Sequence, residues 1–131
     1  MKEEEAREAY FELKIIEEQM KQLQRQLAQI EAGIAEFENA IKSVEELKGK
    51  SGEEAFVPVS AGIYAKSTIG DTESFVVNVG ANVAVEKSGE ETMKIIEKQV
   101  EEMKKYREQM MKGMQLLSAR AEEIERMVCQ N

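Results

Sequence analysis

The side chains of this chain that could do chemistry are its carboxylates and one cysteine. The 131 residues include no histidine, so they supply neither a histidine base nor a histidine metal ligand. Cys129 has no histidine to activate it and no second cysteine to form an intrachain disulfide. Neighbouring carboxylates, such as Glu17 with Glu18 and Glu122 with Glu123, fall on expected helix faces, where solvated charge is the ordinary case. We therefore expect no enzyme activity, no metal site and no cofactor.

Composition and charge also restrict the expected partners. The chain has 26 acidic and 18 basic residues, a net charge of −8, and no segment basic enough to follow a phosphate backbone. Its first five residues are acidic where a signal peptide would be basic, and no apolar run approaches the roughly 20 residues that span a bilayer. We expect a cytoplasmic protein with a reduced cysteine, no nucleic-acid partner and no membrane association.

Binding through apolar side chains remains possible, and most of the apolar residues lie in two long heptad repeats. Apolar residues recur at alternating steps of three and four from Ala6 to Val44, and again from Met93 to Val128. Arg107 is the one polar residue in this register. A 3.5-residue period kept over five heptads is typical of a coiled coil. Because a compact segment joins the two stretches, we expect them to pair as antiparallel helices, with both chain termini at one end.

Local signals set the expected bounds of the helices. Glu3–Glu5 favours a helix start, and the basic, glycine-containing Lys48–Gly52 ends that helix near Leu47. Ser88 and Glu91 form a capping box where the second heptad pattern begins. The chain is accordingly divided into an N-terminal coiled-coil helix at 1–50, a middle segment at 51–89 and a C-terminal coiled-coil helix at 90–131.

The middle segment alternates apolar and polar residues as β-strands do. Val, Ile, Thr, Phe and Tyr dominate residues 55–87, and turn signals lie at 60–62, 70–71 and 80–82. We expect about four short strands, in two hairpins or a small meander, with Pro58 at an edge or a strand start. Four such strands cannot bury both faces by themselves, so the segment is predicted to mediate oligomerisation. The predicted contact residues are Phe56, Val57, Val59, Ile63, Ile69, Phe75, Val77, Val79, Val83 and Val85.

The end of the helix pair that holds both termini is the predicted binding end. Alanines make the heptad seam thin there, so weak packing and frayed ends are expected. Apolar residues outside the seam, among them Tyr10, Phe11, Met111 and Leu116, are equally open to a structural and a binding interpretation. Seam methionines are interpreted as coiled-coil filling, although methionine also adapts to variable partners. The predicted binding residues are Ala6, Ala9, Tyr10, Phe11, Leu13, Leu117, Ile124, Met127 and Val128.

The order helix, two hairpins, helix, together with the stretches Phe56–Lys66 and Val76–Glu86, resembles the alpha subunit of prefoldin. The similarity covers nearly the whole chain, and the turn glycines Gly62, Gly70 and Gly80 make it specific. Two hairpins, rather than one, favour the alpha class over the beta class. The resemblance implies an α+β fold. In that fold, two β-hairpins are inserted between the helices of a long antiparallel coiled coil, and the hairpins of several subunits form a β-barrel.

The same resemblance implies a function and partners. Prefoldins of this type are hetero-oligomers of two alpha and four beta subunits. They bind unfolded client proteins at the coiled-coil tips and pass them to a group II chaperonin without using ATP. Prefoldin beta subunits, unfolded clients and a group II chaperonin are therefore the expected partners. Relatives of the alpha class also form filaments, so a self-assembling coiled-coil scaffold or filament subunit is the alternative.

Overall fold

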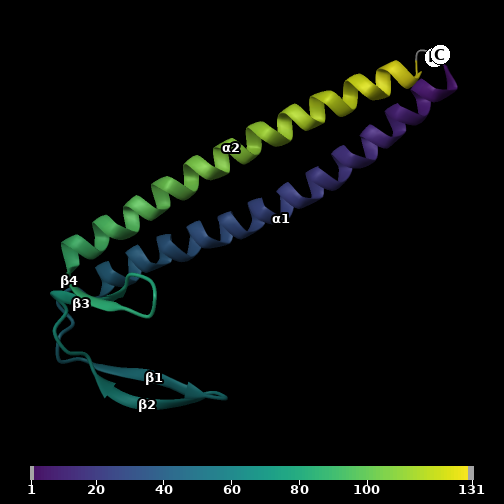
Figure 1. Ribbon diagram of the computed structural model, residues 1–131. Coiled ribbons are helices and arrows are strands. Elements are labelled where there is room, and N and C mark those ends of the chain that lie inside the picture. Colours follow the sequence, from purple (N-terminus) through teal and green to yellow (C-terminus); the bar gives the residue numbers. More distant parts are fainter. Residues whose placement is uncertain (1, 130–131) are drawn as a thin grey trace. The chain divides into compact units, whose positions relative to one another are not determined.

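The structure is a computed structural model, and it describes residues 2–129. By contacts the chain forms two units: a terminal unit of Met1–Ile34 with Glu102–Asn131, and a hairpin unit of Ala35–Glu101. The expected order of helix, two hairpins and helix is confirmed (Figure 1). The elements are α1 (Glu3–Leu47), β1 (Glu54–Ser60), β2 (Ile63–Thr68), β3 (Ser74–Asn78), β4 (Ala84–Ser88) and α2 (Gly89–Cys129).

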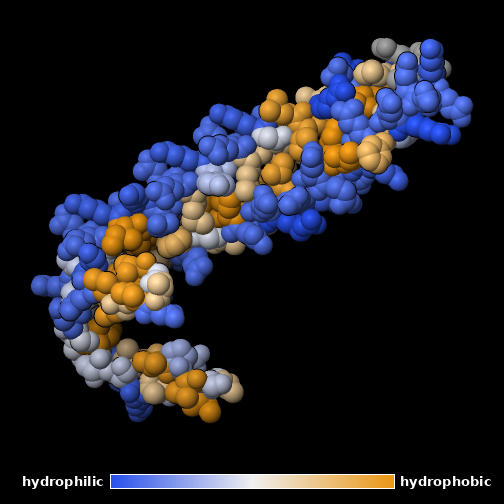
Figure 2. Space-filling model, viewed as in Figure 1, coloured by the Kyte–Doolittle hydropathy of each residue, from blue (hydrophilic) through white to orange (hydrophobic). Residues whose placement is uncertain are grey.

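The heptad seam is the buried stripe of both helices. Each of its positions from Ala6 to Val44 on α1, and from Met93 to Val128 on α2, is buried or half-buried. Arg107 keeps this register and is half-buried too. In the terminal unit, α1 and α2 run antiparallel, and apolar side chains lie between polar flanks (Figures 1 and 2). The heptad prediction is therefore confirmed along both helices.

A small core forms in the terminal unit. Ala9, Ile16 and Ile124 make one buried cluster, and the half-buried Leu13 packs against it. Burying an isoleucine or leucine side chain contributes about 1.5–3 kcal/mol to the free energy of unfolding. The other half-buried residues around the cluster are Met20, Leu117, Ala121 and Val128.

Both ends of α1 and the start of α2 have a local chemical cause. The first turn of α1 carries three glutamates, which favour the positive end of the helix dipole. After Leu47, Gly49 has a φ of 76°, a left-handed conformation that ends a helix at little cost in glycine. At the start of α2, the Glu91 N–H donates to Ser88 Oγ and the Ser88 hydroxyl donates to Glu91 Oε1, both at 3.1 Å. The predicted capping box is thus present.

The middle segment forms two separate antiparallel hairpins. β1 pairs with β2 from Glu54 opposite Thr68 to Pro58 opposite Tyr64, with a register shift before Ser60. β3 pairs with β4, and no hydrogen-bonded strand joins the two hairpins among the described residues. The hairpin alternative is therefore correct, and the meander is not observed. Proline has no N–H group to donate to a neighbouring strand. It is tolerated at position 58 because β1 is an edge strand.

Candidate functional site

The β1–β2 hairpin exposes large apolar side chains on both faces. Residues opposite each other in an antiparallel pair share a face, so Pro58 and Tyr64 lie on one face and Val57 and Ala65 on the other. Phe56 alternates to the face of Pro58. The exposed large apolar residues of this hairpin are Phe56, Val57, Val59, Ile63 and Tyr64. A lone two-stranded hairpin is marginally stable in water, and exposed apolar faces of this kind are normally covered by another surface.

The β3–β4 hairpin has one half-buried face. Phe75, Val77 and Val85 are half-buried on that face, whereas Val76 on the opposite face is 75% exposed. The Gly89 N–H donates to the Glu73 carbonyl at 2.9 Å, which ties the start of α2 to the strand. Three predicted contact residues lie outside the strands: Ile69 is half-buried in the connection between hairpins, and Val79 and Val83 are exposed around the β3–β4 turn.

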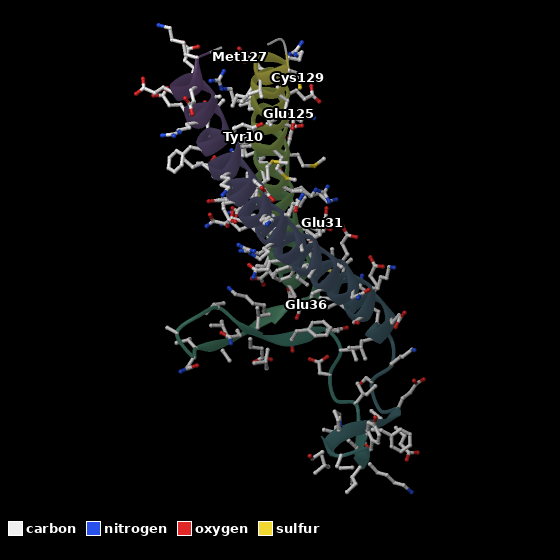
Figure 3. All side chains as sticks on the ribbon, turned by 90° about the vertical axis from the view of Figure 1, so that its right-hand side faces the viewer. Tyr10, Glu31, Glu36, Glu125, Met127 and Cys129 are labelled. Carbon is white, nitrogen blue, oxygen red and sulfur yellow. The ribbon has the colours of Figure 1, made fainter. Side chains whose placement is uncertain are left out.

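The terminal end of the helix pair separates the predicted binding residues into two groups. Tyr10 and Met127 are exposed outside the seam (Figure 3), and Phe11 is exposed there too. Ala9 and Ile124 are buried inside it, and Ile124 is only 1% exposed, so the expectation of weak packing is wrong at this layer. The other predicted residues are half-buried seam residues: Ala6, Leu13, Leu117 and Val128. While the helices are paired, therefore, the exposed group alone offers full side chains to a partner.

Further exposed apolar residues lie along the helices. Ile15 was not predicted, although it stands four residues after Phe11 and thus on the same face of α1. On α2, Tyr106, Met111 and Leu116 are exposed outside the seam. Their departure from the heptad positions is the sequence signal that identifies them.

An ion pair joins α1 and α2 near the predicted binding residues. Arg120 Nε donates to Glu12 Oε1 at 2.8 Å, and Arg120 Nη2 donates to Glu12 Oε2 at 3.1 Å. Arg120 Nη1 also lies 3.3 Å from Glu123 Oε2 on the same helix. The hydrogen bond from Arg120 lowers the pKa of the Glu12 carboxyl, and the hydrogen bond to Glu12 raises the pKa of Arg120. A two-pronged contact of this geometry fixes the register of α1 against α2.

This ion pair predicts an acid-dependent contribution to stability. Because the folded pKa of Glu12 is below its ordinary value of 4.5, the pair stabilises the helices above that pH and loses its effect as pH falls through the lowered pKa. Glu12→Gln is therefore expected to lower Tm by a few degrees near neutral pH and by nothing in strong acid. Thermal unfolding followed by circular dichroism across pH measures this difference. An equal Tm deficit for Glu18→Gln, an exposed glutamate on the same helix, would contradict the assignment to Arg120.

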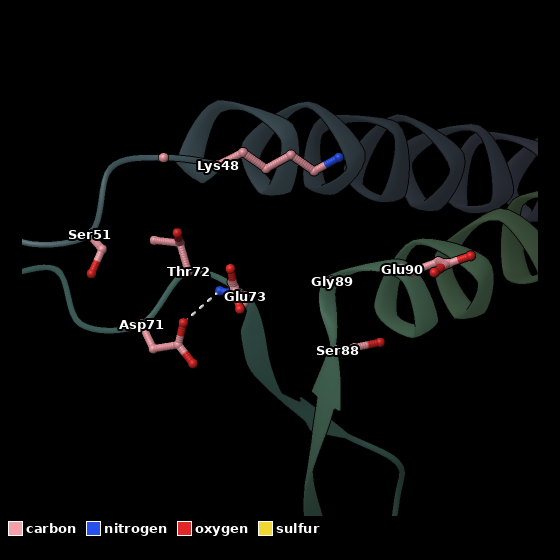
Figure 4. A pocket seen from close by; sticks show the side chains of 9 residues that line it. Lys48, Ser51, Asp71, Thr72, Glu73, Ser88, Gly89 and Glu90 are labelled. Atoms are coloured by element: carbon pink, nitrogen blue, oxygen red, sulfur yellow. Dashed lines mark hydrogen bonds between the residues drawn. The ribbon is translucent and has the colours of Figure 1, made fainter.

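An open polar hollow of about 640 Å³ lies in the hairpin unit, between the end of α1, the connection of the two hairpins and the start of α2 (Figure 4). Its side chains bond locally: Asp71 Oδ1 accepts the Glu73 N–H at 2.9 Å. The lining residues are Lys48, Gly49, Ser51, Asp71, Thr72, Glu73, Ser88, Gly89 and Glu90. These residues include no cysteine, and across residues 2–129 no cluster of three or more Cys, Asp or Glu is placed to hold a metal ion.

None of the helices within the described part of the chain is long and apolar enough to cross a membrane.

Residues 16–131 match the family model described as Prefoldin subunit. The chain belongs to the prefoldin family, which is a family of chaperones rather than of enzymes. The resemblance inferred from the two hairpins and their turn glycines is thus confirmed.

The curated relatives that match are archaeal alpha subunits. "Prefoldin subunit alpha" of Thermofilum pendens is 38% identical over 86 residues, which cover 66% of this chain and 65% of that relative. "Prefoldin subunit alpha" of Methanobrevibacter smithii is 32% identical over 89 residues, covering 63% of this chain and 61% of the relative. The matches thus span slightly less than two thirds of the length of these relatives.

A solved structure shares the fold. The cryo-EM structure of filamentous PFD from Methanocaldococcus jannaschii matches with a TM-score of 0.77 and 23% identity, over 86% of this chain and 94% of that chain. The helix–hairpins–helix fold class is therefore confirmed. A barrel built from the hairpins of several subunits is not part of a single chain.

Proposed function

We propose that this chain is a subunit of an ATP-independent co-chaperone that holds unfolded proteins and delivers them to a group II chaperonin. The observation that carries the proposal is the exposure of Tyr10, Phe11 and Met127 outside the seam at the end of the helix pair. Side chains that the coiled coil does not need are free to cover apolar segments of an unfolded chain. Membership of the prefoldin family supports the co-chaperone role.

Assembly of several subunits raises the affinity for a client protein above that of a single helix pair. The exposed faces of the β1–β2 hairpin support a hetero-oligomer, in which two copies of this chain and four prefoldin beta subunits pair their hairpins into an intersubunit barrel. The helix pairs of several subunits in one assembly then bind the same client. The second and later contacts form at high effective concentration, so several weak contacts together give a high overall affinity. The cytoplasm is the proposed compartment, in keeping with the single exposed thiol of Cys129.

The test of holding is a triple variant, Tyr10→Ser, Phe11→Ser and Met127→Ser. Each serine removes most of a side chain that would lose water on binding, at about 25 cal/mol per Å² of apolar area. We expect the variant to assemble with a prefoldin beta subunit as before, but to suppress aggregation of a denatured client several-fold less well. Native mass measurement and light scattering are the two readouts. Tyr106→Ser, an exposed aromatic residue farther along α2, is the matched control. Full suppression by the triple variant would contradict the proposal.

The alternative function is a self-assembling scaffold or filament subunit. The likeness to filamentous PFD from Methanocaldococcus jannaschii supports this candidate. Sizing of the chain alone separates the two functions. Growing polymers support the scaffold, whereas a small species that forms a defined complex only with a beta subunit supports the holdase.

A further inference from the structure

A second feature of the binding end is a hollow between α1 and α2 on the side of the helix pair that carries Met127. Its volume is about 230 Å³. The buried side chains of Ala9 and Ile124 line it, and Met127, which is 45% exposed, borders it. The small-molecule pockets of proteins usually occupy about 300–1,000 Å³. The hollow is therefore of a size to admit single side chains, such as an unfolded chain presents one after another.

The rim of the hollow carries three glutamates and one arginine, Arg120, and therefore a net negative charge. Glu5, Glu8 and Glu12 of α1 all line it. Glu12 is held by Arg120, but within residues 2–129 no ion pair joins Glu5 or Glu8 to a cation. Glu5 and Glu8 stand three residues apart, so they are neighbours on one helix face and repel each other. A cation brought between them would relieve that repulsion.

We propose that this hollow binds extended polypeptide segments in which a lysine or arginine adjoins a large apolar side chain. The apolar side chain packs against Met127 at the mouth of the hollow, while the cation lies between Glu5 and Glu8. The inference rests on the proposed holding function and adds a preference to it. Tyr10 and Phe11 do not line the hollow, so their contacts carry no such charge preference.

The expected selectivity is modest at each hollow. An exposed charge pair changes affinity by a factor of about two to five, and the effect weakens as salt is added. Because the apolar contact and the charge contact are made together, loss of either one lowers affinity by a similar factor. Clients with clustered acidic residues around their apolar segments are consequently held less well.

Peptide binding to the full chain tests the proposal. The probes are three fluorescent peptides of equal length: one alternates lysine with leucine, the second has glutamate in place of lysine, and the third has serine in place of leucine. Anisotropy titrations at low salt should show the lysine–leucine peptide binding about two- to fivefold more tightly than the other two. The double variant Glu5→Gln, Glu8→Gln should remove this advantage over the glutamate–leucine peptide. Raised salt should weaken the advantage as well.

The matched control is Glu4→Gln with Glu18→Gln, which removes the same charge from α1 outside the hollow. The control should leave the peptide preference within about twofold of the unaltered chain. Equal losses of peptide preference in the two double variants, or no preference among the peptides, would overturn the proposal.

Client aggregation measured on the same samples separates this proposal from the proposed holding function. If suppression persists without any peptide preference, the hollow alone is rejected; if suppression is absent from the unaltered complex, the holding function is rejected too.

Discussion

Replacing Val57 by aspartate is expected to abolish assembly of this chain with other subunits. Val57 lies on the face of the β1–β2 hairpin opposite to Tyr64, and both side chains are exposed in the single chain. An aspartate carboxylate enclosed by a partner's apolar surface would lose its water without gaining a hydrogen bond. Such a change at the centre of an interface costs about 2 kcal/mol or more, at least a thirtyfold loss of affinity. Native mass measurement with a beta subunit should show unassembled chains.

Tyr64→Asp should have an equal effect, because the other face of the hairpin is as apolar as the face of Val57. The matched control is Asn82→Asp, which adds the same charge in the β3–β4 turn, where Asn82 has a φ of 61° that aspartate tolerates. Helix content measured by circular dichroism should be unchanged in all three variants. Normal assembly of either hairpin variant would show that its face stays in water, and the proposed intersubunit barrel would need a different arrangement.

The helices and hairpins of this fold could be predicted because turn residues separate the elements and because both ends of α1 and the start of α2 have a local chemical cause. Glutamates begin α1, Gly49 follows its end, and the Ser88–Glu91 pair begins α2. These causes act over a few residues, so they can be recognised in the sequence without knowledge of the rest of the fold. Alternation along the strands is less informative, since it does not show where pairing stops. For this reason Val79 was predicted with the strand, although β3 ends at Asn78.

The candidate site was predicted less well because it depends on how side chains of two helices meet. The alanines of the terminal seam suggested weak packing, yet Ala9 lies in one buried cluster with Ile124. A small side chain lets a neighbouring helix approach closely, and that fit is absent from a single heptad pattern. The pair Glu12–Arg120 was missed for the same reason, because residues 108 positions apart meet only in the correct register. The exposed Tyr10 was found because it breaks the pattern of its own helix.

Shortening Ile124 to alanine is expected to open the terminal end of the helix pair selectively. Ile124 is 1% exposed and packs in one cluster with Ala9 and Ile16. Removing its outer methyl groups leaves a cavity, and truncations of this kind cost about 2–5 kcal/mol. Hydrogen exchange should lose protection at α1 residues 3–20 and α2 residues 117–129, while the paired strands of the hairpins keep theirs. Leu116→Ala, at a side chain that is 73% exposed, should change protection little.

The same variant decides how the buried members of the predicted binding set act. Opening the helix end would expose Leu13, Leu117 and Val128, which are half-buried when the helices are paired. If clients bind to those seam residues, Ile124→Ala should hold clients better than the unaltered chain. We expect no such gain, because Tyr10 and Phe11 offer their side chains without any opening and the hollow beside Met127 needs Ile124 in place. A several-fold gain in aggregation suppression would instead make separation of the helices the step that exposes the binding surface.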